Sequence, residues 1–171
     1  MIAIEPITLA NVEIFKTIRL RALEETPSAF ASTYARESQM SDEEWRSRVE
    51  RWSGESGIGF LAFDKNTAFD EDAACGIAGA FFDANDRSRA QLISMWTAPT
   101  HRRRGAGRML VNEVAAWAQG RGAEVLQLMV TSRNDAAMRF YERLGFRRTG
   151  RIEPYPNDPA LMEYEMARPL A

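Results

Sequence analysis

The chain has 171 residues, and its 22 basic and 24 acidic side chains leave a net charge of −2. This length predicts one domain spanning residues 1–171, and the slight acidic excess argues against a dedicated nucleic-acid-binding protein. The sequence contains one cysteine, Cys75, and one histidine, His101. It therefore excludes an internal disulfide and a zinc site built from Cys and His ligands, and we expect no metal.

Targeting segments are not evident in the sequence. It contains no apolar run of about 18 residues, the length expected of a membrane-spanning helix. It also has no basic N-terminal stretch followed by an apolar core, the pattern typical of a signal peptide. We therefore expect a cytoplasmic protein that binds neither a membrane nor nucleic acid.

A strand and two helices open the predicted order of elements. Residues 2–7 predict a strand, and Thr8 can cap a helix whose apolar residues recur at helical spacing. A polar and aromatic connector, residues 27–40, follows. Ser41 and Glu44 then have the spacing of a capping box, in which each side chain bonds the backbone N–H of the other residue. This predicts the start of a second helix.

Three strands, two helix–strand units and a closing strand complete the prediction. Short connections between the strands of residues 58–97 require antiparallel pairing, whereas residues 90–130 allow a parallel, right-handed crossover. Gly145 suits the left-handed position after the last helix, and we expect a Pro-rich loop at residues 153–159. The predicted strands are 2–7, 58–63, 74–82, 90–97, 125–130, 146–151 and 161–166, and the predicted helices are 8–26, 41–52, 105–120 and 135–144, with a break at 54–57 and a loop at 64–72.

One segment between a predicted strand and a predicted helix has the character of a phosphate-binding loop. Glycine lets a backbone approach a ligand closely, and the unpaired N–H groups at a helix start bind anions. No Gly-Lys-Ser/Thr follows the segment, and the three-glycine dinucleotide fingerprint is absent. A basic, solvated loop is the alternative for this segment alone. Its residues are Arg102, Arg103, Arg104, Gly105, Ala106, Gly107 and Arg108.

A second motif follows the next predicted strand. Asn134, Ala137, Phe140, Tyr141, Gly145 and Phe146 form the pattern N-x-x-A-x-x-F-Y-x-x-x-G-F. Together with R-x-x-G-x-G at residues 102–107, preceded by Pro99, it resembles the GNAT superfamily of acyl-CoA-dependent N-acetyltransferases. One helix and one strand separate the two motifs, as they do in that family.

The resemblance implies a fold and a donor. The fold would be α/β, with a mixed, mostly antiparallel central sheet of about seven strands and helices on both faces. The sheet would be splayed between its fourth and fifth strands. The acyl donor would be acetyl-CoA, bound as a cosubstrate.

The resemblance also implies roles for individual residues. The backbone of Met95, Trp96 and Thr97 would pair with the pantetheine arm, and the bulged strand around Trp96 and Thr97 would stabilise the reaction's oxyanion. Backbone N–H groups of residues 103–108 would hold the pyrophosphate, and Asn134 would bond the pantetheine region. The other cofactor-binding positions implied by the motifs are Arg102, Ala137 and Phe140.

Tyr141 would act as the general acid that protonates the departing CoA thiolate. A phenol with a pKa of about 10 is protonated at neutral pH and can donate a proton. The alternative is a core aromatic residue beside Phe140. Many family members also carry a glutamate that deprotonates the amine, but Gln91, Ser94, Gln127 and Met129 stand in the corresponding regions, and Glu124 is the only carboxylate near them. The sequence therefore identifies no general base.

Residues 29–44 and 153–163 would flank the acceptor, with Phe30, Tyr34 and Tyr155 as candidate substrate-binding residues, because aromatic rings suit a cationic amine. We predict direct transfer of acetyl from acetyl-CoA to a primary amine of a small molecule. A covalent route through Cys75 is disfavoured, because no histidine lies beside it in the sequence.

Three alternatives to this function stay open. The acceptor could be a protein or peptide amine, or the chain could be a non-catalytic acyl-CoA-binding or sensing domain. A nucleic-acid module using the three consecutive arginines, residues 102–104, would require steeply salt-dependent binding. A homodimer is compatible with each of these readings.

Overall fold

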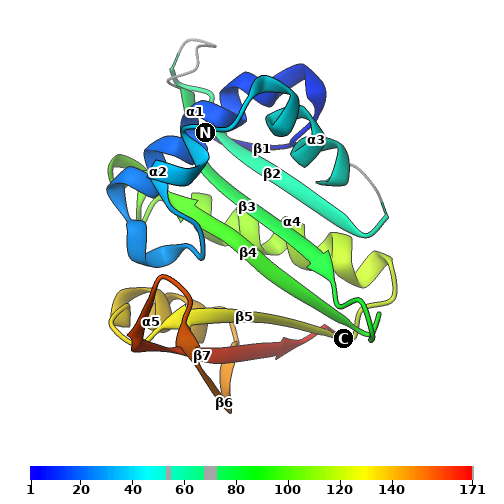
Figure 1. The fold of residues 1–171 in the computed structure, drawn as a ribbon. Helices are drawn as coiled ribbons and strands as arrows, with labels where there is room; N and C mark the ends of the chain where they lie inside the picture. Colours follow the sequence, from blue (N-terminus) through cyan, green and yellow to red (C-terminus); the bar gives the residue numbers. More distant parts are fainter. Residues whose placement is uncertain (53–54, 68–72, 171) are drawn as a thin grey trace.

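The computed structural model describes residues 1–52, 55–67 and 73–170, which form a seven-stranded sheet in the order β1-β2-β3-β4-β5-β7-β6 (Figure 1). Every neighbouring pair is antiparallel except β4 and β5, which are parallel. The predicted mixed, mostly antiparallel sheet is confirmed. The strands are β1 Ile2–Pro6, β2 Gly57–Asp64, β3 Ala74–Phe82, β4 Arg89–Thr97, β5 Val125–Thr131, β6 Arg147–Tyr155 and β7 Asp158–Pro169.

Helices cover both faces of the sheet, with α4 behind the strands in the view of Figure 1. Glycines let them approach closely. A Cβ at Gly59 would lie 2.3 Å from Cε3 of Trp52 in α3, and a Cβ at Gly76 would lie 2.9 Å from Cδ1 of Leu110 in α4. The helices are α1 Val12–Glu25, α2 Tyr34–Glu37, α3 Asp42–Trp52, α4 Ala106–Gly120 and α5 Asp135–Arg143, with short 3-10 segments η1 Leu9–Asn11, η2 Pro27–Ala29 and η4 Pro99–His101.

Strands β4 and β5 pair over a short stretch and then separate. Their register is Arg89 with Val125, Ala90 with Leu126 and Gln91 with Gln127. Figure 1 shows the two strands converging beside the C-terminus and diverging toward the opposite end. The expected splay between the fourth and fifth strands is therefore present, and it leaves an edge of β4 without a β5 partner beyond residue 91.

A bulge distorts β4 where the two strands diverge. Ile77 of β3 pairs with Trp96, but Gly79 pairs with Ile93, so Ser94 and Met95 together oppose a single residue of β3. Ser94 has a φ of 56°, which is uncommon outside glycine. The bulge thus lies two residues before the position expected from the sequence, because the long-range register with β3 decides it.

The closing strands differ from the prediction. Residues 153–159 do not form a Pro-rich loop: β6 continues through Pro154 to Tyr155, and β7 begins at Asp158. Proline is tolerated here because β6 lies at the edge of the sheet, where a strand needs fewer backbone donors. The connector of residues 27–40 contains the short helix α2, which the sequence did not predict.

Other local predictions agree with the structure. Ser41 Oγ accepts the N–H of Glu44 at 3.2 Å, and Glu44 Oε2 accepts the N–H of Ser41 at 2.6 Å, which completes the capping box. Gly145 has a φ of 91°. Residue Gly54 of the predicted break and residues 68–72 of the predicted loop lie outside the described residues. No helix in the described part of the chain is long and apolar enough to cross a membrane.

Candidate active site

A cavity of about 420 Å³ occupies the splay between β4 and β5. Residues from both halves of the chain line it, so the site exists only in the folded protein. The first half contributes helices and the bulged strand, and the second half contributes β5, α5 and β7. Lining residues include Arg19, Phe30, Arg48, Gln91, Ser94, Met95, Met129, Thr131, Asn134, Ala137, Tyr141 and Glu163.

The loop before α4 presents a row of unused backbone donors. Arg103 has a φ of 63° and Gly105, the N-cap of α4, a φ of 91°. The N–H of Met109 bonds the carbonyl of Gly105, but no backbone N–H from residue 103 to residue 108 has an acceptor among the described residues. A helix N-terminus with free N–H groups attracts phosphate. The loop therefore fits the pyrophosphate of CoA.

The arginine side chains of this loop differ in their contacts. Arg102 donates from Nε to the carbonyl of Thr97 at 3.0 Å and from Nη2 to Oε2 of Glu25 at 2.7 Å. It therefore braces the loop against β4 and the end of α1. Arg103 and Arg108 are exposed and form no ion pair within the described residues, which leaves both guanidinium groups free to face phosphate oxygens.

The strand end beside the loop is also anchored. The indole N–H of Trp96 donates to Oε2 of Glu25 at 2.9 Å, and its side chain is buried outside the cavity. Gly107 sits between Phe140, Met95 and Thr97, since a Cβ there would lie 3.1 Å from Cζ of Phe140. The fold thus brings together residues of the loop before α4, of β4 and of α5 that the two motifs had indicated.

Tyr141 lies on α5 with its side chain 8% exposed, and it lines the cavity. Its hydroxyl has no hydrogen-bond partner among the described residues. Burial raises the pKa of this phenol, so it stays protonated at neutral pH. Asn134 also lines the cavity, while its Oδ1 caps α5 by accepting the N–H of Ala137 at 3.1 Å. These two residues are therefore positioned by the same helix.

Glu163 is a cavity residue that the sequence did not single out. It lies on β7 opposite Thr131 of β5, and the Thr131 hydroxyl is buried without a partner in the described structure. Burial and the charge of Glu153 on β6 raise the pKa of Glu163. Glu124 is exposed at the opposite end of β5, where its N–H bonds Ser88. Only the strand register reveals that Glu163, rather than Glu124, reaches the cavity.

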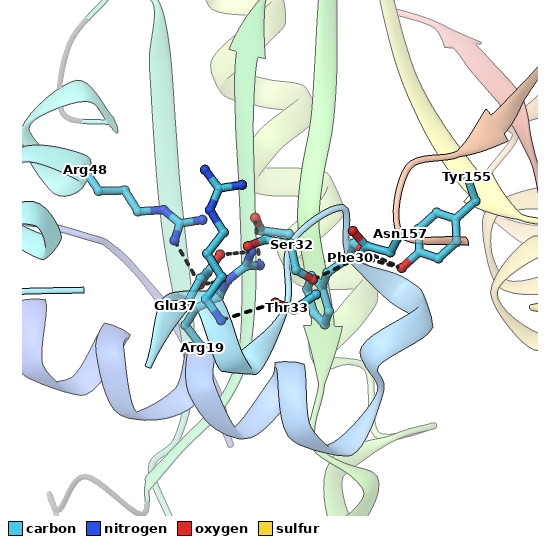
Figure 2. Close-up of polar contacts among 10 residues, drawn as sticks. Arg19, Phe30, Ser32, Thr33, Glu37, Arg48, Tyr155 and Asn157 are labelled. Atoms are coloured by element: carbon cyan, nitrogen blue, oxygen red, sulfur yellow. Dashed lines mark hydrogen bonds and ion pairs between the residues drawn. The ribbon is translucent and has the colours of Figure 1, made fainter. Parts of the chain in front are cut away.

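The hairpin between β6 and β7 is hydrogen-bonded to the connector that precedes α2 (Figure 2). The Tyr155 hydroxyl donates to the carbonyl oxygens of Phe30 and, at 3.1 Å, Pro27. Asn157 Nδ2 donates to the carbonyls of Phe30 at 3.0 Å and Ser32 at 3.2 Å. Phe30 lines the cavity, whereas Tyr155 fastens the hairpin beside it. Tyr34 is 44% exposed and does not line the cavity.

Cys75 is buried on β3 and does not line the cavity. Burial, together with the charge of Asp64, raises the pKa of its thiol to about 11. A thiolate nucleophile is therefore disfavoured at neutral pH. The described residues also contain no group of three or more His, Cys, Asp and Glu side chains that could hold a metal ion.

The chain matches the model of the acetyltransferase (GNAT) family over residues 20–146. It is 35% identical over 119 residues to the ribosomal protein bS18-alanine N-acetyltransferase of Salmonella typhimurium, covering 66% of this chain and 76% of that enzyme. It is 38% identical over 71 residues to the streptothricin acetyltransferase of Streptomyces lavendulae, covering 42% of this chain and 37% of the relative. An uncharacterized N-acetyltransferase of Methanocaldococcus jannaschii is 37% identical over 60 residues, which are 35% of this chain and 26% of that protein.

Solved structures share the fold at lower identity. An acetyltransferase of the GNAT family from Streptococcus pneumoniae superposes with a TM-score of 0.79 and 21% identity, over all of both chains. The PaiA N-acetyltransferase of Thermoplasma acidophilum, solved in complex with coenzyme A, superposes with a TM-score of 0.75 and 17% identity over 99% of each chain. With the family match, these findings show that this chain belongs to the acetyltransferase (GNAT) family.

Proposed function

We propose that the protein transfers acetyl from acetyl-CoA directly to a primary amine of a small molecule. The observation that carries this proposal is the limited volume of the cavity beside the hydrogen-bonded β6–β7 hairpin. Tyr155 and Asn157 fasten the β6–β7 hairpin to residues 27–32, leaving about 420 Å³ between the walls. A volume of this size is typical of a small-molecule site.

Glu163 is the general base in this proposal. It shares the cavity with Tyr141, and its raised pKa brings a carboxylate closer to the operating pH of a base. Glu163 takes a proton from the ammonium of the acceptor, directly or through one water. The neutral amine then attacks the carbonyl carbon of the thioester, forming a C–N bond and a tetrahedral oxyanion.

Collapse of that oxyanion breaks the C–S bond. The backbone of the bulge at Ser94 and Met95 lies outside the regular β3–β4 ladder, so its N–H groups are candidates for stabilising the oxyanion. Tyr141 gives its proton to the departing CoA thiolate, and the nitrogen of the intermediate releases its extra proton, directly or through water, to the resulting phenolate as the amide forms. Its hydroxyl suits this role because no protein acceptor in the described structure holds it.

A peptide amine is the second candidate acceptor. It is favoured by the 35% identity to the ribosomal protein bS18-alanine N-acetyltransferase, whose name describes an alanine acceptor on a protein. The streptothricin acetyltransferase match instead favours a small molecule. The two relatives thus point to different acceptor classes, and the limited volume of the cavity is the reason for choosing the small one.

The deciding experiment measures thiol release from acetyl-CoA with purified protein and a panel of acceptors. The panel contains amino acids, polyamines, aminoglycosides and short peptides with a free N-terminal alanine. Release with small amines but not with peptides is the expected result. Release with peptides alone would overturn the small-molecule proposal. Binding of acetyl-CoA without release for any acceptor would favour the non-catalytic alternative.

A further inference from the structure

We propose that Arg48 and Arg19 form a carboxylate-binding subsite in the acceptor cavity, so that the acceptor is an amine that also carries a carboxylate, as in a free amino acid. This inference rests on the proposed small-molecule function and specifies its substrate class. Arg19 comes from α1 and Arg48 from α3, and both side chains line the cavity. Neither residue belongs to the two motifs that indicate the donor site.

The two arginines share one carboxylate (Figure 2). Glu37 of α2 accepts from Arg19 through Nε at 2.9 Å and Nη2 at 2.8 Å, and Arg48 Nη1 lies 3.0 Å from Glu37 Oε2. Although burial raises the pKa of Glu37, its bonds with Arg19 and Arg48 lower it to about 2, so it is ionised. No other acidic side chain in the described structure pairs with either arginine. Two cations against one carboxylate leave one positive charge in excess.

The excess positive charge lies beside the cavity, where it is accessible to a ligand. Arg19 is 3% exposed, and its Nη1 donates to Ser94 Oγ on the bulge at 3.2 Å, so three of its five N–H groups are already bonded. Within the described residues the one ion pair of Arg48 is with Glu37, and its side chain is 18% exposed. An excess cation in a partly buried site is costly without an anion. A guanidinium presents a planar fork that suits a carboxylate.

Aromatic rings hold Arg48 in place. Its guanidinium carbon lies 5.6 Å from the ring centres of Trp45 and Trp52 and 5.8 Å from that of Phe15. These contacts restrict a flexible side chain before any ligand binds, which lowers the entropy that binding costs. The ordered guanidinium is therefore suited to selective binding.

The same cavity also carries a group of the complementary charge. Glu163 on β7 belongs to the C-terminal half, whereas Arg19 and Arg48 belong to the N-terminal half. An amino acid can direct its ammonium to Glu163 and its carboxylate to Arg48. A polyamine would place a second cation beside the arginine pair, which disfavours it by repulsion.

The test compares each free amino acid with its amide, which keeps the amine and removes the negative charge. With the wild-type protein, kcat/KM is expected to be at least about tenfold higher for the acid than for the amide, as a charge-assisted hydrogen bond predicts. Short aliphatic carboxylates without an amine should inhibit competitively against the acceptor, and the matched amides should not. Both measurements need no variant and therefore do not depend on whether a variant folds.

Variants then test whether Arg48 causes the preference for the free amino acid over its amide. Arg48→Gln is expected to raise KM for the free amino acid at least about tenfold while leaving KM for the amide and for acetyl-CoA unchanged. Arg48→Lys should recover part of the loss. Arg46→Gln removes an exposed charge from the same helix and should behave as wild type.

Equal rates for free amino acids and their amides would overturn the subsite while leaving the small-molecule function in place. So would an Arg48→Gln variant that raises KM for both acceptors alike. Acetylation of peptides alone would instead overturn the proposed function. The two failures are therefore distinguishable in one set of assays.

Discussion

Nε2 of His101 lies 3.0 Å from Oδ2 of Asp64, and this contact connects η4, which directly precedes the loop of residues 102–108, to the end of β2. Asp64 also accepts the backbone N–H of Asn66 at 3.0 Å and lies 3.6 Å from the N-terminal amine. The Asn66 N–H and the His101 side chain lower the pKa of Asp64 to about 2. The carboxylate is therefore stabilised in its ionised form in the folded protein.

Asp64→Asn should lower the midpoint of thermal unfolding at neutral pH. A group whose folded pKa is lowered contributes stability above its unfolded pKa of about 3.9, and loses it as pH falls through the folded value. The difference from wild type should therefore shrink between about pH 4 and pH 2. Calorimetry across this range measures it, with Glu113→Gln on the exposed face of α4 as a control. A difference that stays constant with pH would contradict the role of ionised Asp64.

Tyr141→Phe should lower kcat roughly 10²- to 10⁴-fold, the range expected for the loss of a general acid. The KM for acetyl-CoA should change little. Because the hydroxyl has no partner among the described residues, the thermal midpoint should not fall. Tyr34→Phe, which alters an exposed tyrosine outside the cavity, is the matched control. An unaltered rate would remove Tyr141 from the mechanism.

Glu163 should determine the acid limb of the pH–rate profile. Because burial and repulsion by Glu153 raise its pKa, the limb of kcat/KM should lie above the usual glutamate value of about 4.3. Glu163→Gln should remove that limb and lower the rate. Glu153→Gln should move the limb to lower pH, since it removes the repelling charge.

The thermal stability of the Glu163→Gln variant distinguishes a catalytic role of Glu163 from a structural one. A carboxylate whose folded pKa is raised makes the folded state less favourable as pH rises above the unfolded pKa. Glu163→Gln should therefore keep or raise the thermal midpoint at pH 7. A lower midpoint combined with an unchanged pH profile would show that Glu163 supports the fold and not the reaction.

Three glycines, the N-cap of α4 and two within that helix, should respond differently to alanine. Gly107→Ala places a Cβ 3.1 Å from Phe140 and 3.2 Å from Met95, so it should raise KM for acetyl-CoA by moving residues beside the loop. Gly105→Ala meets no atom within 4 Å but requires a φ of 91°, and it should cost about 1 kcal/mol of stability. Gly120→Ala meets no atom within 4 Å and should be nearly neutral in both assays. Equal effects at all three positions would contradict these assignments.

Much of the architecture could be predicted from local patterns. The Ser41–Glu44 capping box, the left-handed Gly145 and the strand and helix periods depend on residues a few positions apart. The two motifs are also short segments: residues 102–107 lead into α4, and Tyr141 lies on α5. Local backbone preferences are properties of short segments, and they survive in the folded chain.

The sequence could not predict features that depend on long-range register. Pro154 and Tyr155 were expected in a loop but belong to β6, because pairing with β7 outweighs the turn tendency of proline at a sheet edge. The bulge at Ser94 is decided by how β4 pairs with β3. In strands, a shift of one residue reverses which side chains face a cavity.

The sequence by itself predicted the order of the strands and of the four longer helices, indicated the family and singled out the loop of residues 102–108, because these features depend on residues close together along the chain. Only the tertiary structure decided the acceptor side. It brought Glu163 opposite Thr131, seated Arg48 beside Arg19 and Glu37, and fastened Tyr155 to Phe30. These side chains are far apart in sequence, and each pair meets only when the sheet and its helices have packed.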